Sequence, residues 1–115
     1  MTQLQWHTIC DASDLTEQVG TRALVGQDQV AIFKVEGALY AIGAIDPFTH
    51  AAVLSRGMIG SLQSRIVVAS PLLKQHFDLE TGECLEDDTV SVATYPIKEE
   101  GGKILVAPAQ EVAVS

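Results

Sequence analysis

The sequence predicts an all-β domain, a sandwich or barrel of short strands. Aliphatic and β-branched runs recur along the chain and are separated by turn residues such as Gly, Pro, Asp and Ser. No convincing long helix lies between them. Hydrophobic residues make up 47% of the 115 residues and charged residues only 19%. A chain of this length and composition fits one domain with an ordered core.

The N-terminal half is expected to contain four strands, of which the last two form a hairpin. The segment from Asp11 to Gly20 has the composition of a loop with a short helical turn. The pair Glu36-Gly37 lies between two apolar runs, which is a strong hairpin signal. The expected strands are residues 6–10, 21–25, 30–35 and 38–42.

The C-terminal half alternates loops with strands. Residues 43–60 are expected to form a long structured loop, because Asp46-Pro47 disfavours a helix and glycines interrupt the pattern. Ser70-Pro71 ends the next strand and opens a second loop. The further expected strands are residues 65–69, the pair 77–79 and 83–85 around Thr81-Gly82, and the pair 92–98 and 103–107. Residues 1–107 are expected to form the domain and residues 108–115 a loosely held tail.

Charge and composition exclude several classes of partner. The formal net charge is −8 and the pI is near 4.6, so the chain is expected to repel nucleic-acid phosphates and anionic membrane surfaces. No apolar stretch reaches the roughly 20 residues of a membrane helix, and the N-terminus lacks the regions of a signal peptide. A cytoplasmic location is therefore expected, with Cys10 and Cys84 as free thiols.

Two His and two Cys residues raise the question of a metal site, but their spacing argues against one. The four are His7, Cys10, His76 and Cys84. The first two lie on one predicted strand, where residues face alternate sides, and the other two are separated by a turn. His50 is interpreted as a solvent-facing loop residue. Cys84 has no adjacent activating charge, and the neighbouring Glu83 is expected to raise the pKa of its thiol.

Two loops resemble the paired cluster-binding loops of Rieske ferredoxin-like domains. In that family the first loop runs Cys-Pro-His and is followed at fixed distances by a Leu and a Gly, which correspond here to Leu54 and Gly57. The second loop runs Cys-Pro-x-His and then reaches Phe-Asp and a Thr-Gly turn, as in Phe77-Asp78 and Thr81-Gly82 here. The resemblance implies a Rieske iron–sulfur-protein-like fold of small antiparallel sheets, with two loops at the former cluster end. It places four residues at the ligand positions: Pro47, Thr49, Ser70 and Leu73.

These four residues cannot hold the cluster of that family. A Rieske centre needs two thiolates on one iron and two imidazoles on the other. Proline and leucine side chains have no donor atom, and the hydroxyls of Thr49 and Ser70 are not the soft ligands that iron–sulfur clusters select. The chain is therefore predicted to carry no cluster, which excludes an independent electron-transfer ferredoxin. No catalytic, cofactor-binding or metal-binding residue is expected in it.

The chain is closely similar to one subfamily that keeps this fold without the ligands, the small subunit of the assimilatory NAD(P)H-dependent nitrite reductase. The segments that carry this likeness are Gln29 to Phe33, Ile45 to Phe48, Val53 to Gly57, Val68 to Leu72 with Lys74-Gln75 and Phe77, and Gly82 to Cys84 with Glu86-Asp87. The resemblance implies a cofactor-free subunit of a cytoplasmic enzyme that reduces nitrite to ammonium in nitrate assimilation. It also implies assembly with, or stabilisation of, a catalytic large subunit that carries FAD, an iron–sulfur cluster and sirohaem.

The loop residues leave two interpretations open. Six residues of the two loops are the candidate partner interface: Asp46, Pro47, Phe48, Ser70, Pro71 and Leu72. Their apolar members either form an exposed docking surface or fold inward to fill the space of the lost cluster. The acidic groups Glu86-Asp87-Asp88 and Glu99-Glu100 are interpreted as solvated faces, with docking onto a basic partner as the alternative. A second function from another class is a stand-alone protein-interaction module with no redox role.

Overall fold

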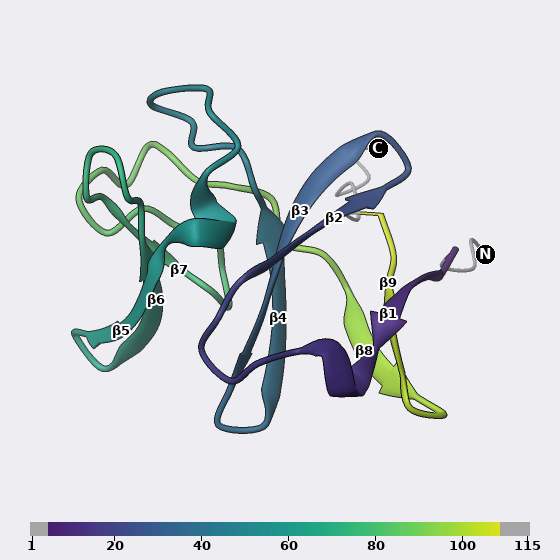
Figure 1. Ribbon diagram of the computed structural model, residues 1–115. Helices are drawn as coiled ribbons and strands as arrows, with labels where there is room; N and C mark the ends of the chain where they lie inside the picture. Colours follow the sequence, from purple (N-terminus) through teal and green to yellow (C-terminus); the bar gives the residue numbers. More distant parts are fainter. Residues whose placement is uncertain (1–4, 109–115) are drawn as a thin grey trace, which may run out of the picture.

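Nine strands and two short 3₁₀ helices make up the described part of the computed structural model, residues 5–108 (Figure 1). The strands are β1 (His7–Asp11), β2 (Thr21–Val25), β3 (Asp28–Val35), β4 (Ala38–Gly43), β5 (Met58–Leu62), β6 (Arg65–Ala69), β7 (His76–Asp78), β8 (Ile97–Glu100) and β9 (Lys103–Val106). The helices are η1 (Ala12–Asp14) and η2 (Leu54–Arg56). The predicted all-β class is confirmed. Within residues 5–108, no helix has the length and apolar character needed to cross a membrane.

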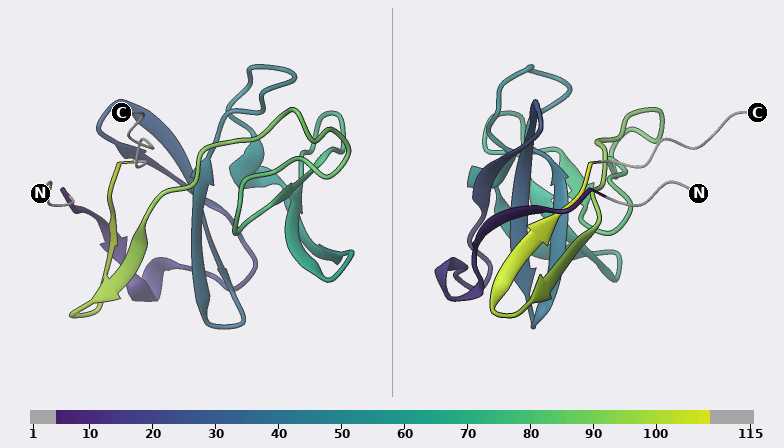
Figure 2. Two further views of the ribbon diagram at one scale, coloured as in Figure 1. Left: turned by 180° about the vertical axis from the view of Figure 1, so that it is seen from behind. Right: turned by 90° about the vertical axis from the view of Figure 1, so that its right-hand side faces the viewer.

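The strands form three antiparallel sheets of three strands each. Their orders are β1-β9-β8, β2-β3-β4 and β5-β6-β7. Figures 1 and 2 show the sheet of β2, β3 and β4 between the other two. The predicted hairpin is present: Val35 pairs with Ala38, and Glu36 and Gly37 in its turn have φ values of 51° and 82°. Positive φ at both central residues matches the twist of the flanking strands.

Strand β3 explains how one small chain builds two cores. Alternate residues of a strand point to opposite faces of the sheet. Ala31, Phe33 and Val35 accordingly enter the core toward the β5-β6-β7 sheet, while Val30 and Ile32 enter the core toward the β1-β9-β8 sheet. Because both faces are covered, β3 appears in the sequence as a continuous apolar run instead of an alternating one.

The expected loop over residues 43–60 is wrong at its C-terminal end, where strand β5 begins at Met58. The loop ends at η2, and β5 pairs antiparallel with β6 from Met58↔Ala69 to Leu62↔Arg65. Its sequence contains Gly60 and Ser61, which have weak strand preference, so the strand is stabilised by its pairing with β6 and not by local propensity.

Two other expected strands are shorter than the sequence suggested. Residues 83–85 contribute only isolated bridges, Phe77↔Cys84 and Glu83↔Ser91. Residues 92–96 form a connection with one bridge, Ile42↔Thr94, and β8 begins at Ile97. Ala93 and Tyr95 hold this connection across the central sheet. The N–H of Gly43 donates to the carbonyl of Ala93, and the N–H of Tyr95 donates to the carbonyl of Ala41. Of the predicted C-terminal tail, residues 109–115 lie outside the described residues.

Candidate functional site

The first loop, residues 44–53, is built around Asp46, whose side chain is fully buried. The backbone N–H of Asp46 donates to the carbonyl of Ala51 (2.8 Å), and the N–H of His50 donates back to the carbonyl of Asp46 (2.7 Å). Asp46 Oδ1 accepts the N–H of Phe48 at 2.8 Å, an arrangement typical of an Asx turn. His50 closes the loop with a φ of 61°. The loop is therefore internally hydrogen-bonded at both of its ends.

The second loop, residues 70–75, repeats this arrangement around Ser70. The N–H of Ser70 donates to the carbonyl of Gln75 (2.8 Å), and the N–H of Lys74 donates to the carbonyl of Ser70 (3.1 Å). Ser70 Oγ accepts a long hydrogen bond from the N–H of Leu72 (3.4 Å), and Lys74 has a φ of 67°. Each loop also places a proline, Pro47 or Pro71, directly after its key residue. The two loops thus share one backbone design.

The key residues of the two loops meet in the interior. Ser70 Oγ donates a hydrogen bond of 2.5 Å to Asp46 Oδ2, and both side chains are 0% exposed. This contact ties the loops together across the space between them. This hydrogen bond was not predicted from the sequence. The signal present in the sequence was the repeated pattern of a short polar residue followed by proline, Asp46-Pro47 and Ser70-Pro71.

The four predicted ligand positions lie in these loops but in different environments. Ser70 is buried, Pro47 and Thr49 are half-buried, and Leu73 is 52% exposed. Thr49 Oγ1 accepts a long hydrogen bond from the N–H of Ala51 (3.4 Å), within its own loop. The hydrogen-bond pattern makes Asp46, one residue before Pro47, the counterpart of Ser70. Which residues replaced the ligands stays a prediction.

The tips of the two loops differ in what they do with their apolar side chains. Phe48 packs inward against the core, with its ring centroid 6.3 Å from that of Phe77. Leu72 is 51% exposed, beside Leu73. Of the six residues predicted as a partner interface, Asp46 and Ser70 are buried, so their side chains could act in docking only by holding the loops in shape.

Comparison with known proteins identifies the family. The model of the "Rieske-like [2Fe-2S] domain" matches residues 5–107. The NADH nitrite reductase small subunit of Escherichia coli K12 is 43% identical over 102 residues, which cover 87% of this chain and 94% of that protein. The chain belongs to the Rieske-like family of nitrite reductase small subunits. A crystal structure from Mycobacterium tuberculosis, assigned as an NADH-dependent nitrite reductase small subunit, superimposes with a TM-score of 0.89 at 41% identity and covers 98% of this chain and 100% of that one.

A further relative is not a small subunit. The NAD(P)H nitrite reductase large subunit of Klebsiella oxytoca is 35% identical to this chain over 108 residues, which cover 94% of this chain but 11% of that protein. A segment similar to 94% of this chain is therefore part of a large subunit in that organism.

The donor set of this family member does not fit the cluster that the family model is named for. The loops offer a carboxylate, hydroxyls and apolar groups in place of two thiolates and two imidazoles. The oxygens of Asp46 and Ser70 that face one another are already hydrogen-bonded together. The cysteines lie elsewhere, Cys10 on β1 and Cys84 in the core between the central sheet and β5-β6-β7. Within residues 5–108, no group of three or more His, Cys, Asp or Glu side chains is arranged to hold a metal ion.

Other cysteine, histidine and acidic side chains considered in the sequence are buried, paired with other side chains or exposed to solvent. Burial raises the pKa of the Cys84 thiol, and the charge of Glu86 adds to the effect, so the acidic neighbour that matters is Glu86 and not the predicted Glu83. Glu86 also pairs with His76, Nδ1 to Oε2 at 2.6 Å. His50 is exposed, as the sequence predicted. In the second acidic group Glu100 pairs with Lys98 at 3.0 Å.

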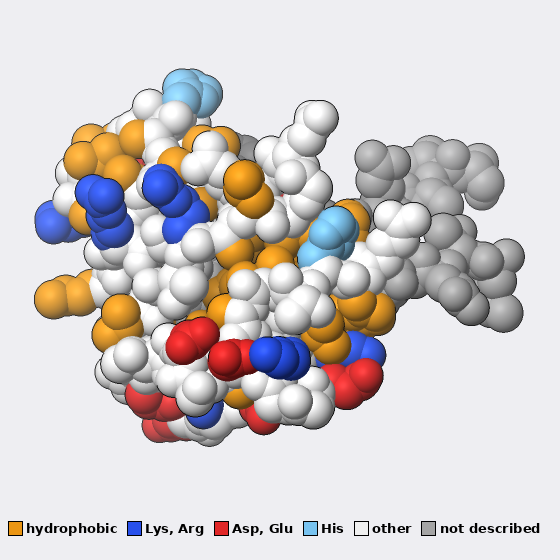
Figure 3. Space-filling model, turned by 45° about the vertical axis from the view of Figure 1, so that its right-hand side comes forward, with side chains coloured by type: hydrophobic (Ala, Val, Ile, Leu, Met, Phe, Trp, Pro, Cys, Tyr) orange, Lys and Arg blue, Asp and Glu red, His pale blue; other side chains and the backbone are white. Residues whose placement is uncertain are grey.

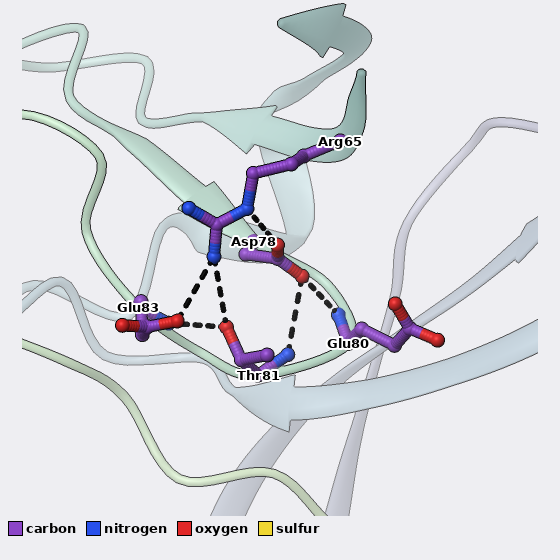
Figure 4. A network of polar contacts seen from close by, with 5 residues as sticks. All are labelled: Arg65, Asp78, Glu80, Thr81 and Glu83. Carbon is purple, nitrogen blue, oxygen red and sulfur yellow. Dashed lines mark hydrogen bonds and ion pairs between the residues drawn. The ribbon is translucent and has the colours of Figure 1, made fainter. Parts of the chain in front are cut away.

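Arg65 organises the most connected polar network, at the turn after β7 (Figure 4). Its guanidinium contacts Asp78 Oδ2 at 2.5 Å, Glu83 Oε1 at 2.9 Å and Thr81 Oγ1 at 3.3 Å. Asp78 Oδ1 accepts the backbone N–H groups of Glu80 (2.7 Å) and Thr81 (3.1 Å). Burial raises the pKa of Asp78, but these hydrogen bonds and Arg65 outweigh it and hold the pKa below its ordinary value. The network pins the turn onto β6 and is structural.

Proposed function

We propose that this chain is a cofactor-free small subunit of a cytoplasmic NAD(P)H-dependent nitrite reductase, which reduces nitrite to ammonium in nitrate assimilation. Its role is to assemble with the catalytic large subunit or to stabilise it. The observation that carries the proposal is the pair of relatives: a separate small subunit at 43% identity, and a large subunit that contains a segment similar to 94% of this chain. Fusion of one domain to another in a related protein indicates that the two work in contact.

The loop geometry supports the cofactor-free part of the proposal. The inter-loop contact between Asp46 and Ser70 is an alternative to metal bridging, since it joins the two loops without an ion. The redox cofactors, FAD, an iron–sulfur cluster and sirohaem, then belong to the large subunit, and this chain supplies a rigid protein surface.

The test is purification of the chain alone and with the large subunit. We expect the isolated chain to contain neither iron nor acid-labile sulfide and to lack visible absorption bands, and we expect it to co-purify with the large subunit. Stoichiometric iron and sulfide would contradict the cofactor-free assignment. Failure of the two chains to co-purify would contradict the subunit assignment and favour a stand-alone interaction module.

A further inference from the structure

One surface at the loop end combines exposed apolar side chains with unpaired positive charge. We call it the tip patch: Arg56, Met58, Leu72, Leu73 and Lys74. Met58 is 78% exposed, and the two leucines are about half exposed. Six large apolar side chains are exposed in the described residues, and the tip patch holds half of them. Arg56, Met58 and Lys74 line one hollow of about 220 Å³ together with Pro71.

The tip patch is held rigidly, so the exposure of its leucines is a property of the fold. The N–H groups of Ser70 and Lys74 close the second loop onto carbonyls of the same loop, and Ser70 is anchored to Asp46. The equivalent tip of the first loop turns Phe48 into the core, whereas the second loop directs Leu72 and Leu73 outward. Clustered exposed apolar side chains with a polar rim typically mark a protein–protein contact.

The charges of the tip patch indicate which kind of surface covers it. The chain has a net charge of −8, and the cations of Arg65, Lys98 and Lys103 are each paired with carboxylates. Of the four other Lys and Arg residues, none forms an ion pair within residues 5–108; Arg56 and Lys74 lie in the tip patch, and Arg22 and Lys34 lie on β2 and β3. On the face drawn in Figure 3, carboxylates gather along the lower part together with some Lys and Arg side chains, and further Lys and Arg side chains lie with apolar ones at the upper left. A cationic rim on an acidic protein fits a partner surface that carries carboxylates.

We infer that the tip patch is the docking surface for the large subunit, and that it packs against an apolar area of that subunit bordered by Asp or Glu. The inference rests on the proposed function. A second copy of this chain is a poorer occupant, because a symmetric contact through the patch would bring Arg56 and Lys74 against the same positive charges of the other copy. The apolar residues form the centre of the contact, and the two cations guide association from its rim.

The test measures binding of the full chain to the purified large subunit by biolayer interferometry. We expect Leu73→Glu and Met58→Glu each to raise Kd at least about 10-fold. Leu24→Glu is the matched control, because Leu24 is 65% exposed on β2, in another sheet, and its substitution should leave Kd unchanged. Lys74→Glu and Arg56→Glu should slow association and reduce its dependence on salt, whereas Lys34→Glu on β3 should not. Circular dichroism melts of each variant verify that it is folded.

The outcomes separate this inference from the proposed function. If the wild-type chain binds the large subunit but Leu73→Glu and Met58→Glu bind equally well, or if Leu24→Glu weakens binding as much, the tip patch is not the docking surface and the subunit assignment stands. If the wild-type chain does not bind at all, both are overturned. A free chain that dimerises, with the dimer broken by Leu73→Glu, would assign the patch to a second copy and overturn the inference.

Discussion

The contact between Ser70 and Asp46 makes a quantitative prediction about stability. Ser70→Ala removes the only hydroxyl that donates to Asp46 Oδ2 in the described structure. Because Asp46 is 0% exposed, that oxygen then stays buried without this donor. A hydrogen bond to a charged acceptor contributes about 1.5–3 kcal/mol, and an unsatisfied buried partner adds a desolvation cost. The weak contact from the N–H of Leu72 is lost as well. We expect a loss of about 2–3 kcal/mol in the free energy of unfolding.

Urea denaturation followed by circular dichroism measures this loss. With m near 1–3 kcal/mol/M, a loss of about 2–3 kcal/mol should lower the midpoint by about 0.7–3 M at unchanged m. Ser61→Ala, an exposed serine on β5, is the control and should change stability by less than about 0.5 kcal/mol. In a double-mutant cycle, the Asp46→Ala/Ser70→Ala variant should lose less than the sum of the single variants, because both remove the same bond. A Ser70→Ala effect no larger than that of Ser61→Ala, or full additivity in the cycle, would refute this account of the loops.

Three other features give predictions of the same kind. Gly57→Ala should lower the free energy of unfolding in urea by about 1–3 kcal/mol, because a Cβ there would lie 2.5 Å from Ala69 O and from Val68 Cγ2. Gly60→Ala is the control and should be tolerated, because its Cβ would meet no atom within 4 Å. Equal stability of the two variants would contradict this. Burial, and then the neighbouring Asp28, raises the pKa of Tyr95 to about 12, so its contribution to stability should be complete below the unfolded pKa of about 10 and lost as pH rises toward 12. Ultraviolet titration should show a late phenolate step that disappears in Tyr95→Phe, and an identical titration of that variant would argue against the assignment. The pKa of Asp78 is lowered in the folded state, so its contribution to the free energy of unfolding is present above the ordinary pKa of Asp and is lost as pH falls through the folded value. Asp78→Asn should therefore flatten the decline of the free energy of unfolding in acid. An unchanged slope would speak against this.

Local patterns in the sequence predicted the elements that local chemistry determines. The β3-β4 hairpin follows from two apolar runs around Glu36-Gly37, whose backbone adopts the positive φ values that such a turn requires. Strand β6 was predicted with its observed bounds because Ile66, Val67 and Val68 favour a strand and Pro71 cannot continue one.

Features that depend on distant contacts could not be predicted in this way. Strand β5 contains Gly60 and Ser61, and its stability comes from pairing with β6. The hydrogen bond between Asp46 and Ser70 joins residues 24 positions apart, and neither residue alone signals a partner. The burial of Phe48 and the exposure of Leu72 follow from how each tip lies against the core, although both loops have the same backbone design. Sequence reasoning therefore located the loops but not the contact that joins them.

The most direct test of the account is NAD(P)H-dependent nitrite reduction by the large subunit, co-expressed with and without this chain. Activity is followed as loss of nitrite per mole of large subunit, with sirohaem and flavin contents measured in both preparations. We expect the two chains to co-purify, and nitrite reduction to be higher or longer-lived at 37 °C when this chain is present. Equal activity and equal half-life in both preparations, with no co-purification, would contradict the claim that the chain is a working subunit of this enzyme.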